Sequence, residues 1–386
     1  MKAMRLALYG GFSEKGRTSL GIETNGYRLL LDAGVKTSAR GGAGYWPAIG
    51  AEDLRAQDAI VVTHAHEDHV AALGWCIEQG FDGRIFMTPE TRDELAGCLA
   101  GYAEPSQRAR VQAAHIETLP VGADALRLGP LHIGTGRSGH VAGGVWCSVA
   151  DATTRIVYCS DVAPGSPVFA MDSPPRCDAI VIDASYADDA IDAAARAAEI
   201  GAWVDRHDGG CVLPTPLYGR SAELLAVVPG PLALAPGIRE ALRAQIGASA
   251  WLADGIAEHL TARLAGAVDW SLHDPLPAAA LLCHDAMGLS GTSPEILQKV
   301  QAQRHPALFT GHLPTRSPGE RMVAAGIADW IRLPTHPTLP ENVALVARSG
   351  ASVVIGHSCD APALARLAAR IPKLRADLST GDRIDC

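Results

Sequence analysis

The sequence predicts a layered α/β fold that contains a second, smaller α/β unit. Over roughly the first 185 residues, short apolar runs of β character alternate with turns and a few helical patterns. From about residue 187 helices and strands alternate more regularly, and the last 50 or so residues resume the pattern of the first region. A chain of 386 residues with 48% hydrophobic residues is long and apolar enough to bury such a core.

The first region is expected to be rich in strands. Residues 19–23 and 27–31 predict a hairpin, because Asn25-Gly26 between them is a strong signal for a two-residue turn. The uninterrupted apolar run 59–63 is typical of a strand that is buried on both faces. Helical patterns cover 70–79 and 90–99. Further expected strands are 6–9, 84–87, 131–133, 145–149, 155–158 and 179–182.

The later region predicts the inserted unit. Its expected helices are 190–206 and 219–225, and its expected strands are 210–213, 279–283, 307–309 and 330–333. The tail predicts helices at 340–348 and 361–370 with a strand at 352–355 between them. We therefore divide the chain into a first domain segment, an insert and a return segment, with bounds 1–186, 187–333 and 334–386.

Composition excludes several classes of protein. The formal charge of −9 argues against a surface coated in basic residues, although it leaves room for a local basic groove. Nine cysteines without CxxC spacing predict reduced, mostly buried thiols rather than a disulfide framework or a cysteine zinc site. No signal-peptide pattern or membrane-length apolar stretch follows Met1, so a cytoplasmic location without membrane contact is expected.

Apolar strands that end in histidine or aspartate are the informative feature. Side chains at the ends of neighbouring strands converge at one edge of a sheet, where they can share an ion. The residues placed in this way are Asp32, His64, His66, His140, Asp161, Asp183 and His357.

The densest group is His64-Ala65-His66-Glu67-Asp68-His69. In an extended segment, His64 and His66 point the same way and can bind one metal together. Asp68 and His69 lie just beyond and can reach a second ion. Imidazole and carboxylate ligands suit zinc, with manganese or iron as alternatives. Leaving so many polar groups unpaired near a buried strand end would be costly, so a purely structural role is disfavoured.

Asp32, the segment 64–69, His140 and Asp161 resemble, in that order, the metal-binding motifs of the metallo-β-lactamase fold. In that fold two β-sheets pack between layers of helices. The insert and its flanks resemble the β-CASP branch of that family, which processes nucleic acids. Within the branch, residues 10–14 and 63–69 look most like ribonuclease J, and the cleavage subunit of mRNA 3′-end processing complexes is a more distant relative. The matching segments of the branch are 183–186, 209–214, 219–224, 285–291, 310–312, His336 and His357.

The resemblance implies a site with two zinc ions, or manganese in their place. The implied ligands are His64, His66 and His140 for one ion, Asp68, His69 and His357 for the other, and Asp161 as a bridge.

The resemblance also implies roles around the metals. Asp68 would orient or deprotonate the attacking water, and His336, oriented by Asp183, would bind the scissile phosphate or protonate the leaving oxygen. Asp32 would brace the metal loop by hydrogen bonds rather than bind metal. The residues implied to contact substrate are Arg220, Ser290, Gly291 and His312.

The expected function is hydrolysis of single-stranded RNA, as an endonuclease or a 5′-exonuclease. A DNA nuclease of the same branch is the nearest alternative. A small-molecule metallohydrolase ranks lower because such enzymes lack the insert, and a non-catalytic nucleic-acid-binding subunit ranks lower because no ligand position is lost. A homodimer is allowed, but the C-terminal dimerisation domain of ribonuclease J is absent. The local cations expected to offset phosphate charge are Arg40, Arg137, Arg220 and Arg316.

Departures from the branch leave the substrate and cleavage mode open. The insert is short, His336 lies in Pro334-Thr335-His336-Pro337 rather than in a Ser-x-His pattern, and His312 replaces an aromatic residue.

Overall fold

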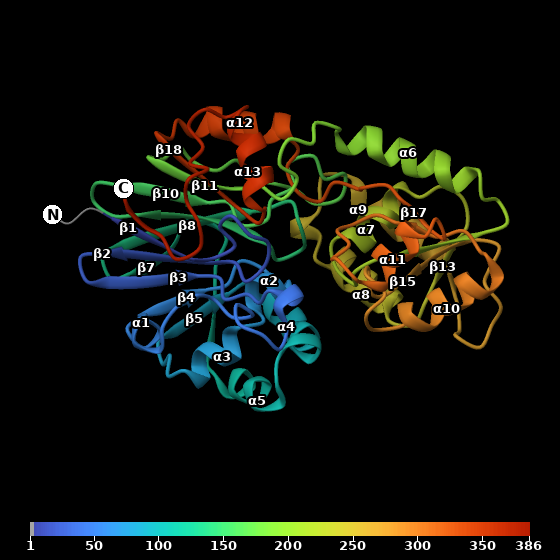
Figure 1. Ribbon diagram of the computed structural model, residues 1–386, viewed down its shortest axis with the longest axis horizontal. Helices are drawn as coiled ribbons and strands as arrows, with labels where there is room; N and C mark the ends of the chain where they lie inside the picture. The colour runs from blue at the N-terminus through green and yellow to red at the C-terminus, as the bar shows by residue number, and fades with distance from the viewer. Residues whose placement is uncertain (1–3) are drawn as a thin grey trace.

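A computed structural model describes residues 4–386 and shows the sandwich that the sequence predicts (Figure 1). One sheet has seven strands in the order β19-β1-β2-β3-β4-β5-β6, and the facing sheet has six in the order β18-β11-β10-β9-β8-β7. The strands of the first sheet that precede the insert are β1 (Arg5–Gly10), β2 (Ser19–Thr24), β3 (Tyr27–Leu31), β4 (Ala59–Val61), β5 (Arg84–Met87) and β6 (Ile116–Thr118). Those of the second are β7 (Gly122–Leu128), β8 (Leu131–Arg137), β9 (Val145–Ala150), β10 (Arg155–Tyr158) and β11 (Ala179–Asp183).

The four layers follow from the alternation of side chains along each strand. Val61 of β4 and Ile156 of β10 belong to the core between the two sheets. Ile60, next to Val61, packs on the other side against the helices of the first sheet. Val157, next to Ile156, packs outward against the helices of the second sheet. Each sheet therefore buries both faces, and the result is the αββα sandwich.

The helices on the first sheet are short. They are η1 (Thr37–Ala39), α1 (Ala51–Arg55), α2 (Glu67–Val70), α3 (Leu73–Glu78), α4 (Pro89–Tyr102) and α5 (Pro105–Ala113). The helix expected over 70–79 is confirmed as α3, but it begins only at Leu73, because Val70 ends α2 and a break at Ala71 and Ala72 separates the two helices. Ala33 and Ala72 form a backbone hydrogen bond of 2.8 Å, which ties this break to the segment after β3. The hairpin at Asn25-Gly26 is confirmed, with Thr24 paired to Tyr27 and positive φ at both turn residues.

Residues 187–333 build a separate sheet of four parallel strands in the order β12-β15-β13-β14, with a two-stranded pair β16-β17 beside it. Its strands are β12 (Cys211–Pro214), β13 (Leu232–Leu234), β14 (Val268–Asp269), β15 (Ala280–Cys283), β16 (Leu308–Phe309) and β17 (Asp329–Trp330). The strand expected at 330–333 ends sooner, at Trp330. The helices are α6 (Ala193–Asp205), α7 (Arg220–Val227), α8 (Ile238–Gly247), η2 (Ser249–Trp251), α9 (Ile256–Gly266), α10 (Ser293–Gln303) and α11 (Pro318–Ala324).

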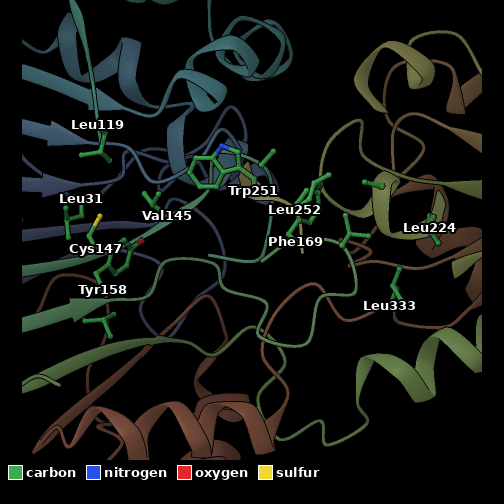
Figure 2. Packing of buried hydrophobic residues seen from close by; sticks show 14 of the residues in the cluster. Leu31, Leu119, Val145, Cys147, Tyr158, Phe169, Leu224, Trp251, Leu252 and Leu333 are labelled. Carbon is green, nitrogen blue, oxygen red and sulfur yellow. The ribbon is translucent and has the colours of Figure 1, made fainter. Parts of the chain in front are cut away.

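The two halves of the molecule share one hydrophobic core. Figure 2 shows Phe169, Trp251 and Leu252 between the sandwich and the later sheet, and all three belong to the core that also fills the sandwich. Backbone hydrogen bonds from Ala170 to the Trp251 carbonyl and from Ala253 to the Val168 carbonyl reinforce this contact. We therefore keep the division at residues 187 and 333 as a proposal about chain organisation.

The return segment completes both sheets of the sandwich. It contains α12 (Leu339–Ser349), β18 (Val353–His357), α13 (Ala361–Ala368) and β19 (Arg383–Asp385). β18 lies parallel to β11, with Asp183 opposite His357, and β19 pairs with β1. The nine cysteines are all free, as expected, and six of them are buried. None of the helices within residues 4–386 has the length and apolar character needed to cross a bilayer.

Candidate metal centre

Most of the predicted ligands lie at one edge of the sandwich because they follow the carboxyl ends of parallel strands, whereas His140 follows β8, which is antiparallel to its neighbours. Asp32 follows β3 and His64 follows β4, two parallel neighbours in the first sheet. Asp161 follows β10, and Asp183 and His357 end β11 and β18, which are parallel in the second sheet. The facing sheets thus bring both groups to a common edge.

Four of the expected metal ligands meet in one cluster. One ligand atom of each lies within 4.8 Å of the others, and the residues are His64, His66, His140 and Asp161. His140 Nε2 is 3.1 Å from His66 Nδ1 and 3.7 Å from Asp161 Oδ2. His140 Nδ1 donates to the Thr335 carbonyl at 2.6 Å, so the Nε2 lone pair of His140 faces the cluster.

The donors of this cluster fit a divalent metal ion. His64 Nε2, His66 Nε2, His69 Nε2 and Asp161 Oδ1 are buried without any hydrogen-bond partner. Burying such atoms unpaired is costly, whereas lone pairs that share a cation are satisfied. Burial also lowers the pKa of His66 to about 4 and the pKa values of His64 and His140 well below 6.5. These three rings are therefore neutral at neutral pH, as metal ligation requires.

Asp32 holds His69 in place from behind. Asp32 is fully buried and its Oδ2 accepts from His69 Nδ1 at 2.8 Å and from the Tyr158 hydroxyl at 2.8 Å. Its Oδ1 accepts from the backbone N–H and the hydroxyl of Thr63. With Nδ1 engaged, His69 directs Nε2 toward Asp161 Oδ1, 3.2 Å away. Burial alone would lower the pKa of His69, but the charges of Asp161 and Asp32 raise it well above 6.5.

A second pair stands beside the cluster. His336 Nδ1 lies 2.8 Å from Asp183 Oδ2 and 3.6 Å from Asp161 Oδ2. Burial is the largest single influence on the pKa of Asp183 and raises it, but interactions with His336, including its hydrogen bond, and with His357 together bring the net pKa below the ordinary value. Asp183 is also fixed by the N–H of Ser185, and its carbonyl accepts from Asn342 Nδ2. The structure thus brings together the two residues expected to act on the phosphate.

The second set of expected ligands is only partly assembled. Within residues 4–386, no group of three or more metal-ligating side chains includes Asp68 or His357. Asp68 lies in the first turn of α2, half-buried. His357 donates from Nε2 to the Ser160 carbonyl at 3.1 Å, and its Nδ1 lies 2.8 Å from Ser358 Oγ. A metal would have to displace the carbonyl of Ser160 from this ring nitrogen, so ligation by His357 stays a prediction.

Of the expected substrate contacts, Arg220 is closest to the cluster. It opens α7 after Gly219, and its Nη2 donates to Thr335 Oγ1 at 3.2 Å, on the residue whose carbonyl accepts from His140. Its Nε is buried without a partner. Gly311 lies against this guanidinium, since a Cβ there would be 2.2 Å from Arg220 Nη1.

The other expected contacts lie on loops of the later half. Ser290 and Gly291 are exposed after β15, and Ser290 Oγ donates to Asp285 Oδ2 at 3.0 Å. His312 is exposed after β16. Arg137, expected as a counter-charge for phosphate, pairs with Asp172 at 2.7 Å, so its charge is already offset in the structure. Sequence reasoning gave no role to Tyr158, Thr63 or Thr335, because nothing in their local sequence shows that their polar atoms reach a ligand.

Comparisons with known proteins agree with the fold. Residues 27–215 match the family profile described as a β-lactamase superfamily domain. The transcription termination factor FttA of Cenarchaeum symbiosum is 27% identical over 278 residues, covering 63% of this chain and 42% of that protein. Ribonuclease TTHA0252 of Thermus thermophilus is 27% identical over 197 residues, covering 48% of this chain and 44% of the ribonuclease. The chain thus spans less than half the length of these relatives.

A crystal structure of a protein of unknown function from Enterococcus faecalis shares the fold. It superposes with a TM-score of 0.66 at 11% identity, and the match covers 100% of both chains.

Proposed function

We propose that this chain, which belongs to the β-lactamase superfamily, is a metal-dependent hydrolase that cleaves phosphodiester bonds in RNA. The observation that carries the proposal is the buried cluster of His64, His66, His140 and Asp161 with the Asp183–His336 pair directly beside it. The names of the relatives point the same way, since they include a ribonuclease and a transcription termination factor.

The cluster fits one ion, and we propose a second beside it. His64, His66 and His140 would hold the first ion, Asp68, His69 and His357 would hold the second, and Asp161 would serve both. Nitrogen and carboxylate donors of this kind suit zinc, with manganese as the alternative. A pair of bound divalent ions supplies a water of lowered pKa and stabilises negative charge on phosphoryl oxygens.

The chain's own residues then orient the reaction. Asp68 accepts a proton from the attacking water, whose oxygen bonds to phosphorus while the bond from phosphorus to O3′ breaks. His336 carries its Nδ1 proton toward Asp183, so its Nε2 is left to bind the phosphate or to donate a proton to O3′. The products are a 5′-phosphate and a 3′-hydroxyl. Asp32 keeps His69 in the ligating tautomer throughout.

The charge of the chain favours a single strand over a long duplex. With a formal charge of −9, counter-charge for phosphate has to come from local groups such as Arg220. Arg220 is held by Thr335 and lies against Gly311, so it can reach a phosphate near His336 without leaving the site. We also propose the loop residues Ser290, Gly291 and His312 as contacts to the strand. A homodimer and a cytoplasmic location stay predictions.

The test is cleavage of 5′-labelled single-stranded RNA and matched DNA by protein loaded with zinc or manganese. The control is the Asp68→Ala/His69→Ala double variant. Cutting of RNA that disappears in the control supports the proposal, and the product ladder separates endonuclease from 5′-exonuclease. Preferential cutting of DNA would mean that DNA, rather than RNA, is the substrate. If metal-loaded protein cuts neither strand, the nuclease proposal fails and small esters become the substrates to test.

A further inference from the structure

A cavity of about 380 Å³ lies beside the metal centre, on the far side of Tyr186. Its lining includes Lys15 from the β1–β2 loop and Tyr186 after β11. The remaining walls come from the later half of the chain, chiefly His312, Glu320, Trp330 and Arg332. Of the four substrate contacts expected from the sequence, His312 lines this cavity and the other three do not.

Tyr186 connects the cavity to the catalytic residues. Its ring centroid is 5.0 Å from that of His336, and its hydroxyl accepts from the Thr335 backbone N–H at 3.1 Å. The Thr335 carbonyl in turn accepts from His140. A molecule in the cavity is therefore separated from His336 by the Tyr186 ring alone. Neighbouring nucleotides of one RNA strand could occupy the cavity and the space at His336 at the same time.

The cavity wall carries a fixed aromatic surface. Trp330 is 39% exposed, although large apolar side chains are usually covered. Its Nε1 donates to the Gly311 carbonyl at 2.8 Å, which fixes the orientation of the ring. Arg332 lies between the two aromatic residues, with Cζ 4.5 Å from the Tyr186 centroid and 5.2 Å from the Trp330 centroid. A flat, exposed and immobilised indole is a suitable platform for stacking a base.

Lys15 places a positive charge without a direct ion-pair partner, among the described residues 4–386, at the same cavity. Its loop neighbours Arg17 and Lys36 both pair with Glu14, at 2.8 Å and 2.7 Å. Across residues 4–386, the Lys15 ammonium has neither a hydrogen bond nor an ion pair. It is half-buried, so its charge is less screened than that of a fully exposed lysine.

The cavity is poorly suited to a free anion. Glu320 also lines it, and Arg332 is already paired with Asp189 at 2.8 Å. The carboxylates offset much of the positive charge, so inorganic phosphate alone would gain little. A ligand that stacks on Trp330 and reaches Lys15 with one phosphate uses both features. Glu320 can accept hydrogen bonds from the amino group of a base.

We propose that this cavity binds a nucleotide that flanks the cleaved bond of the RNA strand, with its base on Trp330 and a phosphate at Lys15. The proposal rests on the proposed function, because it takes the phosphate at His336 as the next group along the same strand.

The test measures binding separately from cleavage. A fluorescein-labelled single-stranded RNA of ten nucleotides is titrated with protein kept metal-free by chelator, and anisotropy gives Kd. Trp330→Leu is expected to weaken binding about 10- to 100-fold, since stacking on one aromatic ring contributes about 1–3 kcal/mol. Trp330→Phe is expected to stay within a few-fold of the wild type, because it keeps a stacking face. Lys15→Gln is expected to reduce the salt dependence of binding by about one phosphate contact.

Arg243→Gln serves as the charge control, since Arg243 is exposed on α8 outside the cavity. Before the chelator is added, each variant should have the metal content and the thermal unfolding temperature of the wild type, which shows that it is folded. Wild-type binding by both Trp330→Leu and Lys15→Gln, or no RNA binding by the wild type, would overturn the proposal. If the variants lose RNA binding while the wild type cuts no RNA, the cavity is a nucleotide-binding site, but its place beside a cleaved bond fails together with the nuclease proposal. If the wild type cuts RNA and the variants bind RNA as the wild type does, the nuclease proposal stands and the cavity proposal fails.

Discussion

The metal cluster and the cavity beyond Tyr186 are built in opposite ways. The ligand side chains of the cluster follow strand ends and lie in the interior, as with His64 at 1% and His140 at 4% exposure. The cavity combines Lys15 of the β1–β2 loop with Glu320 of α11 and Trp330 of β17, and Trp330 is 39% exposed. In this molecule strand ends gather the residues proposed for the chemistry, whereas the cavity beside them is lined by residues from a loop, a helix and a short strand.

The sharpest test of this contrast is the removal of Asp161, the carboxylate shared by most of the cluster. It lies within 4 Å of His64, His69, His140 and His336. Asp161→Ala should therefore lower cleavage by more than the roughly 100-fold that loss of an outer partner costs. Metal analysis of the purified variant should show reduced content. A variant that keeps its metal and its rate would show that Asp161 is not a ligand.

Replacing His336 tests whether the Asp183–His336 pair acts on the substrate rather than binding metal. His336→Gln should slow RNA cleavage on the order of 10²- to 10⁴-fold, the range for loss of a general acid. The metal content should stay that of the wild type, because the cluster's four ligands do not include His336. Loss of metal in this variant would instead place His336 in the coordination shell, as its grouping with Asp161 and Asp183 permits.

Asp32 tests the outer support of the cluster. Asp32→Asn keeps the shape of the side chain but removes the charge that faces His69 Nδ1. We expect metal affinity to fall about 10- to 100-fold, as for other carboxylates that hold a ligating histidine. Competition with a chromogenic chelator measures this directly. Wild-type affinity would mean that Tyr158 and Thr63 suffice to position the loop.

The smallest expected effect lies at the contact between the two halves. Glu223 on α7 is fully buried, and its Oε1 accepts from Ser166 of the sandwich at 2.7 Å. Burial raises the pKa of Glu223 to about 7. A raised pKa in the folded state means that its contribution to stability is present below pH 4.5 and is lost as pH rises toward 7.

The glutamine in the Glu223→Gln variant cannot ionise, so the variant should not lose stability as the pH rises toward 7. From pH 5 to pH 7.5 the free energy of unfolding of the variant should rise by roughly 2 kcal/mol relative to the wild type. Urea unfolding at the two pH values measures the difference. Parallel pH dependence of the two proteins would show that Glu223 is not protonated in the folded state.

The same contrast explains what could be predicted from the sequence. His64, His66 and Asp161 were predictable because a strand end fixes where the next side chains point, whatever the rest of the fold does. The apolar runs 59–63 and 155–158 were likewise predicted as strands, and they agree with β4 and β10 within two residues. The match is poorer nearby, since β8 extends four residues beyond the expected 131–133 and β7 was not expected.

The residues that line the cavity were not predictable in this way. Lys15, Trp330 and Arg332 meet only through the folded positions of segments more than 300 residues apart in the sequence. Nothing in their local pattern distinguishes them from ordinary surface residues. The break between α2 and α3 was missed for a similar reason, because the hydrogen bond between Ala33 and Ala72 comes from a distant segment.

The central claim is that RNA cleavage depends on metal held by the clustered histidines and aspartates. The most direct measurement starts from metal-free protein and adds zinc stepwise, with bound metal and the rate of RNA cleavage determined at each step. The account predicts no cleavage without metal and a rate that rises with occupancy and levels off at two ions per chain. Cleavage by the metal-free protein at the rate of the loaded protein would contradict it.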